Sequence, residues 1–367
     1  MAVFTTQQSG DFNAPATWGT SGLSGAGSPV GGTHIPDGTS DVVVASGHTL
    51  TLVAHATINS FDNSGGGTIT GAGYRLTLDG EASSGYVLDL RGPVSGNLDI
   101  TVNSGTNSLL RIAPTSGTLQ ELKINDANVY EYVGNVTGLE GFILAAGTLQ
   151  TYNANFDWTN TGDSSITGTW GTADLERDNV VSMGSIKLNS GGVFHATSVT
   201  NVTSKNSSNS NRAIDLPTGT FNHNGGMVSY LGTGGSVFRF GDDDLYDFKI
   251  SCNGSSGSGM TLDGDASDSV TVNGSLILEN QSGQGLLVAL ADTGYELTVR
   301  GNLIMNLDTR TANENLQLGY NQTCTAAWTI VGTLMLMNAN EKVRVRSTSG
   351  TMIMGGLINQ GGRIDDQ

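Results

Sequence analysis

A phrase of eleven residues that occurs three times near the C-terminus constrains the fold of this chain more than any other feature. It reads VTVNGSLILEN at 270–280, LTVRGNLIMNL at 297–307 and WTIVGTLMLMN at 328–338. Successive copies begin 27 and 31 residues apart, and each copy holds two short β-type runs joined through a glycine. A repeat period between about 20 and 50 residues is typical of a solenoid, in which each coil buries its apolar face only against its neighbours. The phrase therefore predicts a stack of similar coils.

Short runs earlier in the chain alternate between apolar and polar residues at a period of two. Examples are YRLTL at 74–78, YVLDL at 86–90 and NLDITV at 97–102. This alternation is typical of strands with one buried face, and we find no sustained helical periodicity. The sequence thus predicts an all-β, single-stranded parallel β-helix, right-handed because parallel crossovers almost always are. A β-sandwich or jelly roll is the alternative, but it leaves the repeat unexplained.

The charge balance excludes several classes of partner. The chain has 16 Lys and Arg against 33 Asp and Glu, a formal net charge of −17. Such a surface repels phosphate backbones and anionic lipid, so we expect neither nucleic-acid binding nor attachment to a membrane. No apolar run reaches the roughly 20 residues needed to cross a bilayer, so membrane insertion is not expected either. The opening MAVFTT lacks the features of a secretory signal. That fits a virion component made in a host cytoplasm, or a secreted protein whose signal has been removed.

The opening segment carries a family resemblance. It runs DFNAPATWG at 11–19, PDG at 36–38 and DVVVASGHTLTL at 41–52. This combination resembles the start of β-helical repeat regions in bacterial surface adhesins and in phage fibre, spike and virion-decoration proteins. The resemblance implies that residues 1–40 form an N-terminal arm that caps the stack and that residues 41–367 form the solenoid. It brings no catalytic residue with it.

Two stretches interrupt the regular pattern without dividing the chain into separate domains. We expect irregular loops near 153–176 and near 204–211. The first holds Phe156, Trp158 and Trp170, and Tyr152 directly precedes it. Aromatic rings exposed on a loop stack well against a sugar or a protein partner, so these residues are candidate contacts. The alternative is that the rings pack the loop onto the coil stack.

The search for catalytic chemistry gives no specific site. Acidic stretches at 241–247 and 263–268 supply the oxygen atoms that calcium prefers, but neither completes an EF-hand, and solvated turns explain them equally well. Glycoside hydrolysis needs two carboxylates at a defined separation, and no pair stands out among so many acidic residues. No metal-ligand spacing and no cofactor fingerprint appears. The sequence therefore predicts a protein without enzymatic activity and without a cofactor; a polysaccharide lyase or glycoside hydrolase is the alternative.

The most informative functional signal is apolar. The second run of each repeat does not alternate, which places Ile277, Ile304 and Met335 in a stripe on the outside of the stack, and Ile353 is expected to extend it. A strand that is apolar on both faces is usually covered on both faces. We therefore predict an interface for a homo-oligomer at these four residues, with a trimer as the first candidate.

Together these observations favour a structural virion protein of a phage: a tail fibre, a spike or a capsid-decorating protrusion. Such a protein would present a rigid acidic surface for assembly with other virion proteins and for attachment, with a host surface glycan as one candidate partner. Its expected location is the virion. The alternatives are a fragment of an adhesin that is secreted or held at the bacterial cell surface, and the polysaccharide-degrading enzyme.

Overall fold

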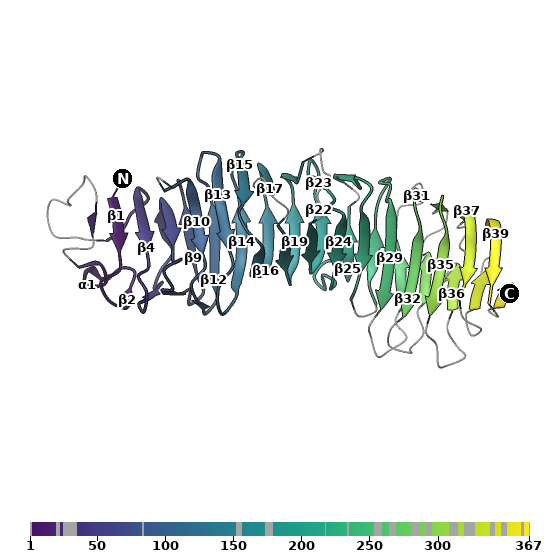
Figure 1. Ribbon diagram of the computed structural model, residues 1–367, viewed down its shortest axis with the longest axis horizontal. Coiled ribbons are helices and arrows are strands. Elements are labelled where there is room, and N and C mark those ends of the chain that lie inside the picture. The colour runs from purple at the N-terminus through teal and green to yellow at the C-terminus, as the bar shows by residue number, and fades with distance from the viewer. Residues whose placement is uncertain are drawn as a thin grey trace. The chain divides into compact units, whose positions relative to one another are not determined.

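The computed structural model of the protein describes residues 2–19, 23–24, 35–82, 84–151, 156–172, 179–216, 218–232, 235–252, 259–263, 269–280, 287–290, 296–307, 315–318, 327–337, 342–345, 351–360 and 363–366. The fold is nearly all β, with 1% helix, and its parallel strands stack in about 11 turns, so the predicted β-solenoid is confirmed. Internal contacts divide the chain into two units, Met1–Thr172 (unit 1) and Ala173–Gln367 (unit 2). In each unit, Figure 1 shows successive strands following one another in chain order.

The strands of unit 1 form three sheets. The first contains β3 (Leu23–Ser24), β1 (Ala2–Thr5), β4 (Ser40–Val43), β7 (Ser60–Asp62), β10 (Tyr86–Leu90), β13 (Ser108–Ile112), β15 (Val129–Tyr132), β17 (Thr148–Thr151) and β20 (Thr169–Trp170). The second contains β2 (Gly10–Asp11), β5 (Thr49–Thr51), β8 (Thr68–Thr70) and β11 (Val94–Ser95). The third contains β6 (Ala56–Ile58), β9 (Tyr74–Leu78), β12 (Leu98–Val102), β14 (Leu119–Ile124), β16 (Val136–Leu144), β18 (Trp158–Asn160) and β19 (Asp163–Ile166). Among these described strands only β3 pairs antiparallel, with β1.

Each strand buries alternate side chains in rows that run along the stack. In the first sheet, one inward row is Val42, Phe61, Leu88, Leu110 and Tyr132, paired from strand to strand in register. All five side chains are buried. Burying a side chain of this size contributes roughly 1.5–3 kcal/mol relative to leaving it exposed. The period-two pattern of the sequence thus becomes a continuous core only because the coils stack.

The N-terminal arm takes part in the stack. Strand β1 pairs in parallel with β4, so residues before position 40 already contribute to the first sheet. The short helix α1 (Pro15–Trp18) ends on Trp18, which is fully buried and lies edge-on against Phe4 and Phe12. Its indole Nε1 donates a hydrogen bond to the Phe12 carbonyl at 2.8 Å. The predicted boundary at residue 40 therefore falls at the start of a strand whose neighbour belongs to the arm.

The strands of unit 2 follow the same plan. One sheet contains β21 (Val180–Met183), β24 (Val199–Val202), β27 (Met227–Tyr230), β29 (Asp247–Cys252), β32 (Leu276–Asn280), β35 (Leu303–Leu307), β37 (Ala327–Leu336) and β39 (Thr351–Asn359). Another contains β22 (Ser185–Leu188), β25 (Arg212–Asp215), β28 (Val237–Arg239), β30 (Gly259–Leu262), β33 (Leu287–Leu290), β36 (Asn315–Leu318), β38 (Lys342–Val345) and β40 (Arg363–Asp366). On a further face β23 (Val193–His195) pairs with β26 (Thr220–Asn222), and β31 (Ser269–Val272) and β34 (Glu296–Val299) pair onward with the first parts of β37 and β39.

The repeated phrase corresponds to a structural register in unit 2. Val270 pairs with Leu297, and Leu297 pairs with Trp328, so the three copies lie directly one above another. The glycine that joins the two runs of each copy forms a tight corner. The Gly301 N–H donates to the Gly274 carbonyl at 2.8 Å, and a Cβ atom built on Gly301 would lie 2.3 Å from that carbonyl oxygen. The same holds at Gly332, whose Cβ would lie 2.2 Å from the Gly301 oxygen. Glycine is therefore required here because the coils approach too closely for any side chain.

Residues 241–246 interrupt a face of unit 2 between β26 and β31. In place of a strand carbonyl, the carboxylate Oδ1 of Asp243 accepts the backbone N–H of Phe221 at 3.3 Å. Within the same segment, Leu245 pairs with Val272 through an isolated parallel bridge: its N–H donates to the Thr271 carbonyl and its carbonyl accepts the Asn273 N–H, each at 2.8 Å. Burial raises the pKa of Asp243 to about 6; the hydrogen bond from Phe221 opposes the shift, and the carboxylates of Asp242 and Asp244 add to it.

This raised pKa predicts a stability that falls with rising pH. The protonated Asp243 stabilises the fold; this contribution is complete below the unfolded pKa of 3.8 and is lost as the pH rises through about 6. Asp243→Asn stays neutral at every pH and keeps an acceptor oxygen. We therefore expect the free energy of unfolding of this variant, taken relative to that of the native chain, to be higher at pH 8 than at pH 4. The expected gain is about 1 kcal/mol, because the site is only partly buried. Urea unfolding at both pH values measures it. Asp242→Asn, at an exposed neighbour, is the control; an equal pH dependence in both variants would contradict the assignment.

Candidate functional site

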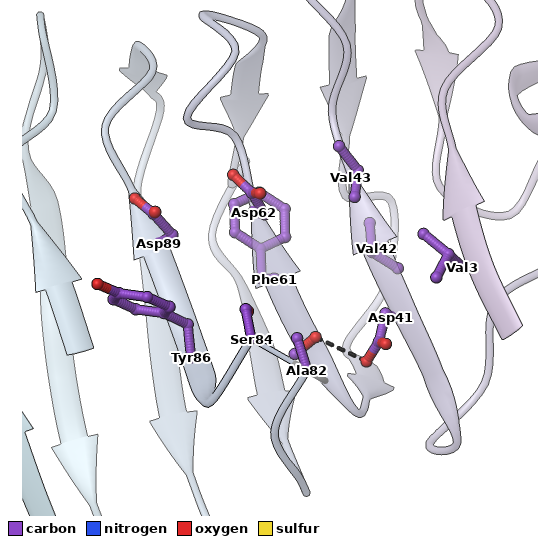
Figure 2. A pocket seen from close by; sticks show the side chains of 11 residues that line it. Val3, Asp41, Val42, Val43, Phe61, Asp62, Ala82, Ser84, Tyr86 and Asp89 are labelled. Carbon is purple, nitrogen blue, oxygen red and sulfur yellow. Dashed lines mark hydrogen bonds between the residues drawn. The ribbon is translucent and has the colours of Figure 1, made fainter. Parts of the chain in front are cut away.

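A cavity of about 200 Å³ opens over β1, β4, β7 and β10 in unit 1. We call it the hollow. Figure 2 shows how consecutive strands contribute its lining, among which are Val3, Asp41, Val43, Asp62, Tyr86 and Asp89. The strand register explains the grouping: Val3 pairs with Asp41, and Val43 pairs with Asp62, which pairs with Asp89. Residues from four adjacent strands of the sheet therefore converge on one patch.

Two carboxylates of the hollow, those of Asp62 and Asp89, lie directly opposite each other on adjacent strands. Like charges in this position destabilise a sheet unless they are compensated. Asp89 is compensated: Arg91 contacts its two oxygens at 2.7 and 2.9 Å, and Arg111 lies 3.7 Å from its Oδ2. The hydrogen bonds that Arg91 donates to Asp89 raise the pKa of the Arg91 guanidinium. Arg111 also covers the ring of Tyr86, with its Cζ atom 5.0 Å from the ring centroid.

The carboxylate of Asp41 is held differently. It retains only 7% of its accessible surface, and its Oδ1 accepts hydrogen bonds from the Ser60 hydroxyl at 2.7 Å (the dashed line in Figure 2) and from the Asn59 amide at 2.6 Å. Within the described residues, its Oδ2 has no hydrogen-bond donor and no cation pairs with it. Asp62 accepts the Ser64 N–H at 2.7 Å and also has no ion pair within the described part of the chain. Of the three carboxylates, those of Asp62 and Asp89 both interact electrostatically with Arg91, whereas Asp41 makes no ion pair within the described residues.

Sequence reasoning did not identify the hollow. Its carboxylates come from coils of unequal length, so no fixed spacing in the sequence connects them. The only signal in the sequence is an aspartate near the end of each of two strands, Asp62 in β7 and Asp89 in β10. Their pairing can be recognised only when the register of the two strands is known. The residues that the structure describes contain no group of three or more His, Cys, Asp or Glu side chains placed to hold a metal ion.

The predicted aromatic contacts need a correction. Trp158 and Trp170 retain 0% and 2% of their accessible surface, and they pack edge-on with ring centroids 4.9 Å apart inside unit 1. They lie on β18 and β20, so part of the expected irregular loop continues the strand pattern. Neither ring is available to a sugar or a partner. Phe156 is partly buried just before β18, and Tyr152 lies outside the described residues.

The predicted outer stripe of unit 2 exists in large part. Ile277 pairs with Ile304, and Ile304 pairs with Met335, each on the outward side of its strand and partly exposed. The fourth member is Ile358, which pairs with Met335; the predicted Ile353 instead pairs with Thr329 on the neighbouring face. We call Ile277, Ile304, Met335 and Ile358 the outer apolar row.

The outer apolar row is confined to one part of unit 2. The corresponding outward positions on the preceding strands of this sheet hold polar residues: Ser182, Asn201, Ser229 and Lys249. Lys249 is neutralised by Glu279 at 2.8 Å. Eight large hydrophobic side chains are exposed among the described residues, and five of them lie on or beside β37 and β39: Val331, Met337, Ile353, Leu357 and Ile358. Leu357 belongs to the inward row and is exposed because no described strand lies beyond β39; the others enlarge the apolar surface.

The fold and these two surfaces define the chain as a parallel β-solenoid protein. Comparisons with protein-family models, with curated proteins and with solved structures give no match. No helix among the described residues is long and apolar enough to span a membrane.

Proposed function

We propose that this chain is a structural β-solenoid subunit that assembles side by side with copies of itself through the outer apolar row. The observation that supports the proposal is the register of Ile277, Ile304, Met335 and Ile358, one outward apolar side chain per coil. An apolar stripe on an otherwise polar exterior marks an interaction surface. Burial of such a surface against a partner contributes roughly 25 cal/mol per Å².

A second copy of the chain is the partner that best fits this surface. The net charge of −17 makes two copies repel each other over most of their exteriors. The outer apolar row carries no charge, and the one lysine at its start is paired within the chain. A row that repeats once per coil matches the spacing of an identical row in a neighbouring copy, so many equivalent contacts form at once. Closed symmetric assemblies are the usual result of such self-complementary surfaces.

The setting that we propose is a phage virion, with the subunit in a fibre, a spike or a capsid decoration that presents a rigid acidic surface for attachment. This setting depends on the resemblance of the opening segment and on the solenoid architecture, since fold alone does not define function. We propose no catalytic role. Electron microscopy of particles labelled with an antibody against the chain tests the setting; label on bacterial cell surfaces rather than on particles would favour the adhesin alternative.

Mutation of the outer apolar row tests the assembly. We expect Ile304→Glu to shift the native oligomer to the monomer, because it places a buried charge at the centre of the interface. The matched control is Thr298→Glu, at a partly exposed outward position on the preceding strand of the same coil. Light scattering coupled to gel filtration gives the mass of each variant. An Ile304→Glu variant that keeps the oligomer mass, or a Thr298→Glu variant that loses it equally, would overturn the proposed interface.

A further inference from the structure

We propose that the turn His223–Gly226 modifies itself at Asn224, whose side-chain amide is lost as ammonia. The turn joins β26 to β27 in unit 2. The attacking group is the backbone nitrogen of Gly225, and the base is the imidazole of His223. The proposal does not depend on lateral assembly, because no residue of this turn belongs to the outer apolar row.

The backbone of the turn explains why its central residues are asparagine and glycine. The Gly226 N–H donates to the His223 carbonyl at 2.8 Å, and the two residues between them have positive φ angles, 49° at Asn224 and 73° at Gly225. Positive φ at both central positions of a turn favours this pair. The same pair favours attack of the backbone on the side chain, because glycine has no side chain to hinder the approach of its nitrogen.

The nitrogen that attacks already has a base beside it. The Gly225 N–H donates a hydrogen bond to Nδ1 of His223 at 2.9 Å. A ring nitrogen that accepts a hydrogen bond carries no proton and is free to take one. A peptide nitrogen is a poor nucleophile until its proton is removed, and a group within hydrogen-bond reach of that proton serves as a general base.

The asparagine lies where the reaction can proceed. Asn224 and Gly225 are both exposed, and a Cβ atom built on Gly225 would meet no atom within 4 Å. The Asn224 amide is held by a hydrogen bond from its Nδ2 to the Ala196 carbonyl at 3.2 Å. Water competes for a bond between neutral groups at an exposed position, so its net contribution is small. The side chain can therefore turn toward Gly225, and water can reach the product.

The reaction needs no partner other than water. As Nδ1 of His223 takes the Gly225 proton, the electron pair of the Gly225 nitrogen forms a bond to Cγ of Asn224. The bond from Cγ to Nδ2 breaks, and the imidazolium returns the proton to the departing nitrogen, which leaves as ammonia. Water then adds to the resulting cyclic imide and breaks one of its two C–N bonds. Cleavage at Cγ gives aspartate, and cleavage at the backbone carbonyl carbon gives isoaspartate; either product adds a negative charge to the turn.

A second Asn-Gly pair in the described chain lacks these properties. The Gly274 N–H donates to the Tyr246 carbonyl at 2.6 Å, as part of the tight corner of the repeat, and not to a base. The side chain of Asn273 is held at both ends: its Oδ1 accepts from Arg300 at 2.8 Å, and its Nδ2 donates to Asp244 at 3.3 Å. Attack at this pair requires local opening of the coil corner. Asn273 should therefore keep its amide.

The test is peptide mapping by mass spectrometry of the full-length native chain during prolonged incubation at neutral pH. Incubation in water enriched in the heavy oxygen isotope marks each new carboxylate. We expect Asn224 to convert at least about tenfold faster than Asn273, because only the latter needs local opening. Both aspartate and isoaspartate should appear at Asn224. The third Asn-Gly pair of the sequence, at 253–254, lies outside the described residues and is followed separately.

A histidine variant tests the role of the base. In His223→Gln the side-chain oxygen can still accept the Gly225 N–H but is not a base, so conversion at Asn224 should slow about tenfold. The matched control is His55→Gln, because Nδ1 of His55 likewise accepts a backbone N–H, that of Arg75, at 2.9 Å. This control should convert at the native rate. A turn loosened by the substitution would convert faster, so slower conversion in His223→Gln identifies the loss of the base.

Four results would overturn the proposal. These are no conversion at Asn224, equal conversion at Asn224 and Asn273 in the native chain, and a native or faster rate in His223→Gln. The fourth is a product that contains aspartate without isoaspartate, because it would show direct hydrolysis of the side-chain amide by water instead of attack by Gly225.

Discussion

Replacement of Gly301 by alanine is expected to destabilise the repeat of unit 2 by about 3 kcal/mol. The added Cβ would lie 2.3 Å from the Gly274 carbonyl oxygen, a backbone atom that is itself fixed by the Gly301 N–H. The coils must therefore separate, which weakens the hydrogen bonds on both sides of the corner and the packing of the adjacent inward rows.

Hydrogen exchange measures this effect where it arises. We expect faster exchange at the amides of β34, β35 and β37 in Gly301→Ala, together with a lower urea midpoint. The control is Gly65→Ala in unit 1, where the nearest atom to the new Cβ, the Ser46 nitrogen, is 3.9 Å away. That variant should differ from the native chain by less than about 0.5 kcal/mol. Equal stability of the two variants would show that the coils do not approach as closely as described.

Replacement of Trp158 by alanine should cost the most among the variants considered, about 3–5 kcal/mol of the stability of unit 1. The ring is fully buried and packs edge-on against Phe142 at 4.9 Å and Tyr132 at 5.4 Å. Its Nε1 donates to the Asn160 side chain at 2.9 Å, so the substitution also leaves a buried acceptor with one partner fewer.

Urea unfolding followed by circular dichroism measures the loss in Trp158→Ala. The milder Trp158→Phe keeps an aromatic ring and should lose clearly less. The pair distinguishes a core residue from a ligand contact: an exposed, ligand-binding tryptophan would tolerate alanine with little change in stability. A loss below about 1 kcal/mol in Trp158→Ala would contradict its place in the core.

The fold could be predicted from the sequence because the repeat and the alternation are local signals. The three copies of the repeated phrase begin at Val270, Leu297 and Trp328, and these residues pair in register, as the sequence predicts. The sequence also shows that each copy contains a glycine between its two runs. It does not show why glycine is required, because the close approach of successive coils is apparent only in the structure. Ile353 was placed wrongly because the sequence around it resembles the second run of the repeat. The last coil is shorter, with Met335 paired to Ile358, 23 residues on, and this shift moves the true partner.

The aromatic residues and the hollow were harder to predict for different reasons. Trp158 and Trp170 lie on strands of three and two residues, which are too short to show a period of two, so polar turns dominate the local pattern. The hollow brings together Asp41, Asp62 and Asp89 from three coils. No sequence rule identifies which of the many aspartates share a row before the strand pairing is known.

Sedimentation equilibrium of the native full-length chain, over a range of protein and salt concentrations, tests the central claim most directly. Lateral assembly through an uncharged apolar row between acidic subunits predicts a mass that is a small whole multiple of one chain. It also predicts that association strengthens as salt screens the repulsion between copies. A chain that keeps the mass of a single subunit at micromolar concentration, in both low and high salt, would contradict the account.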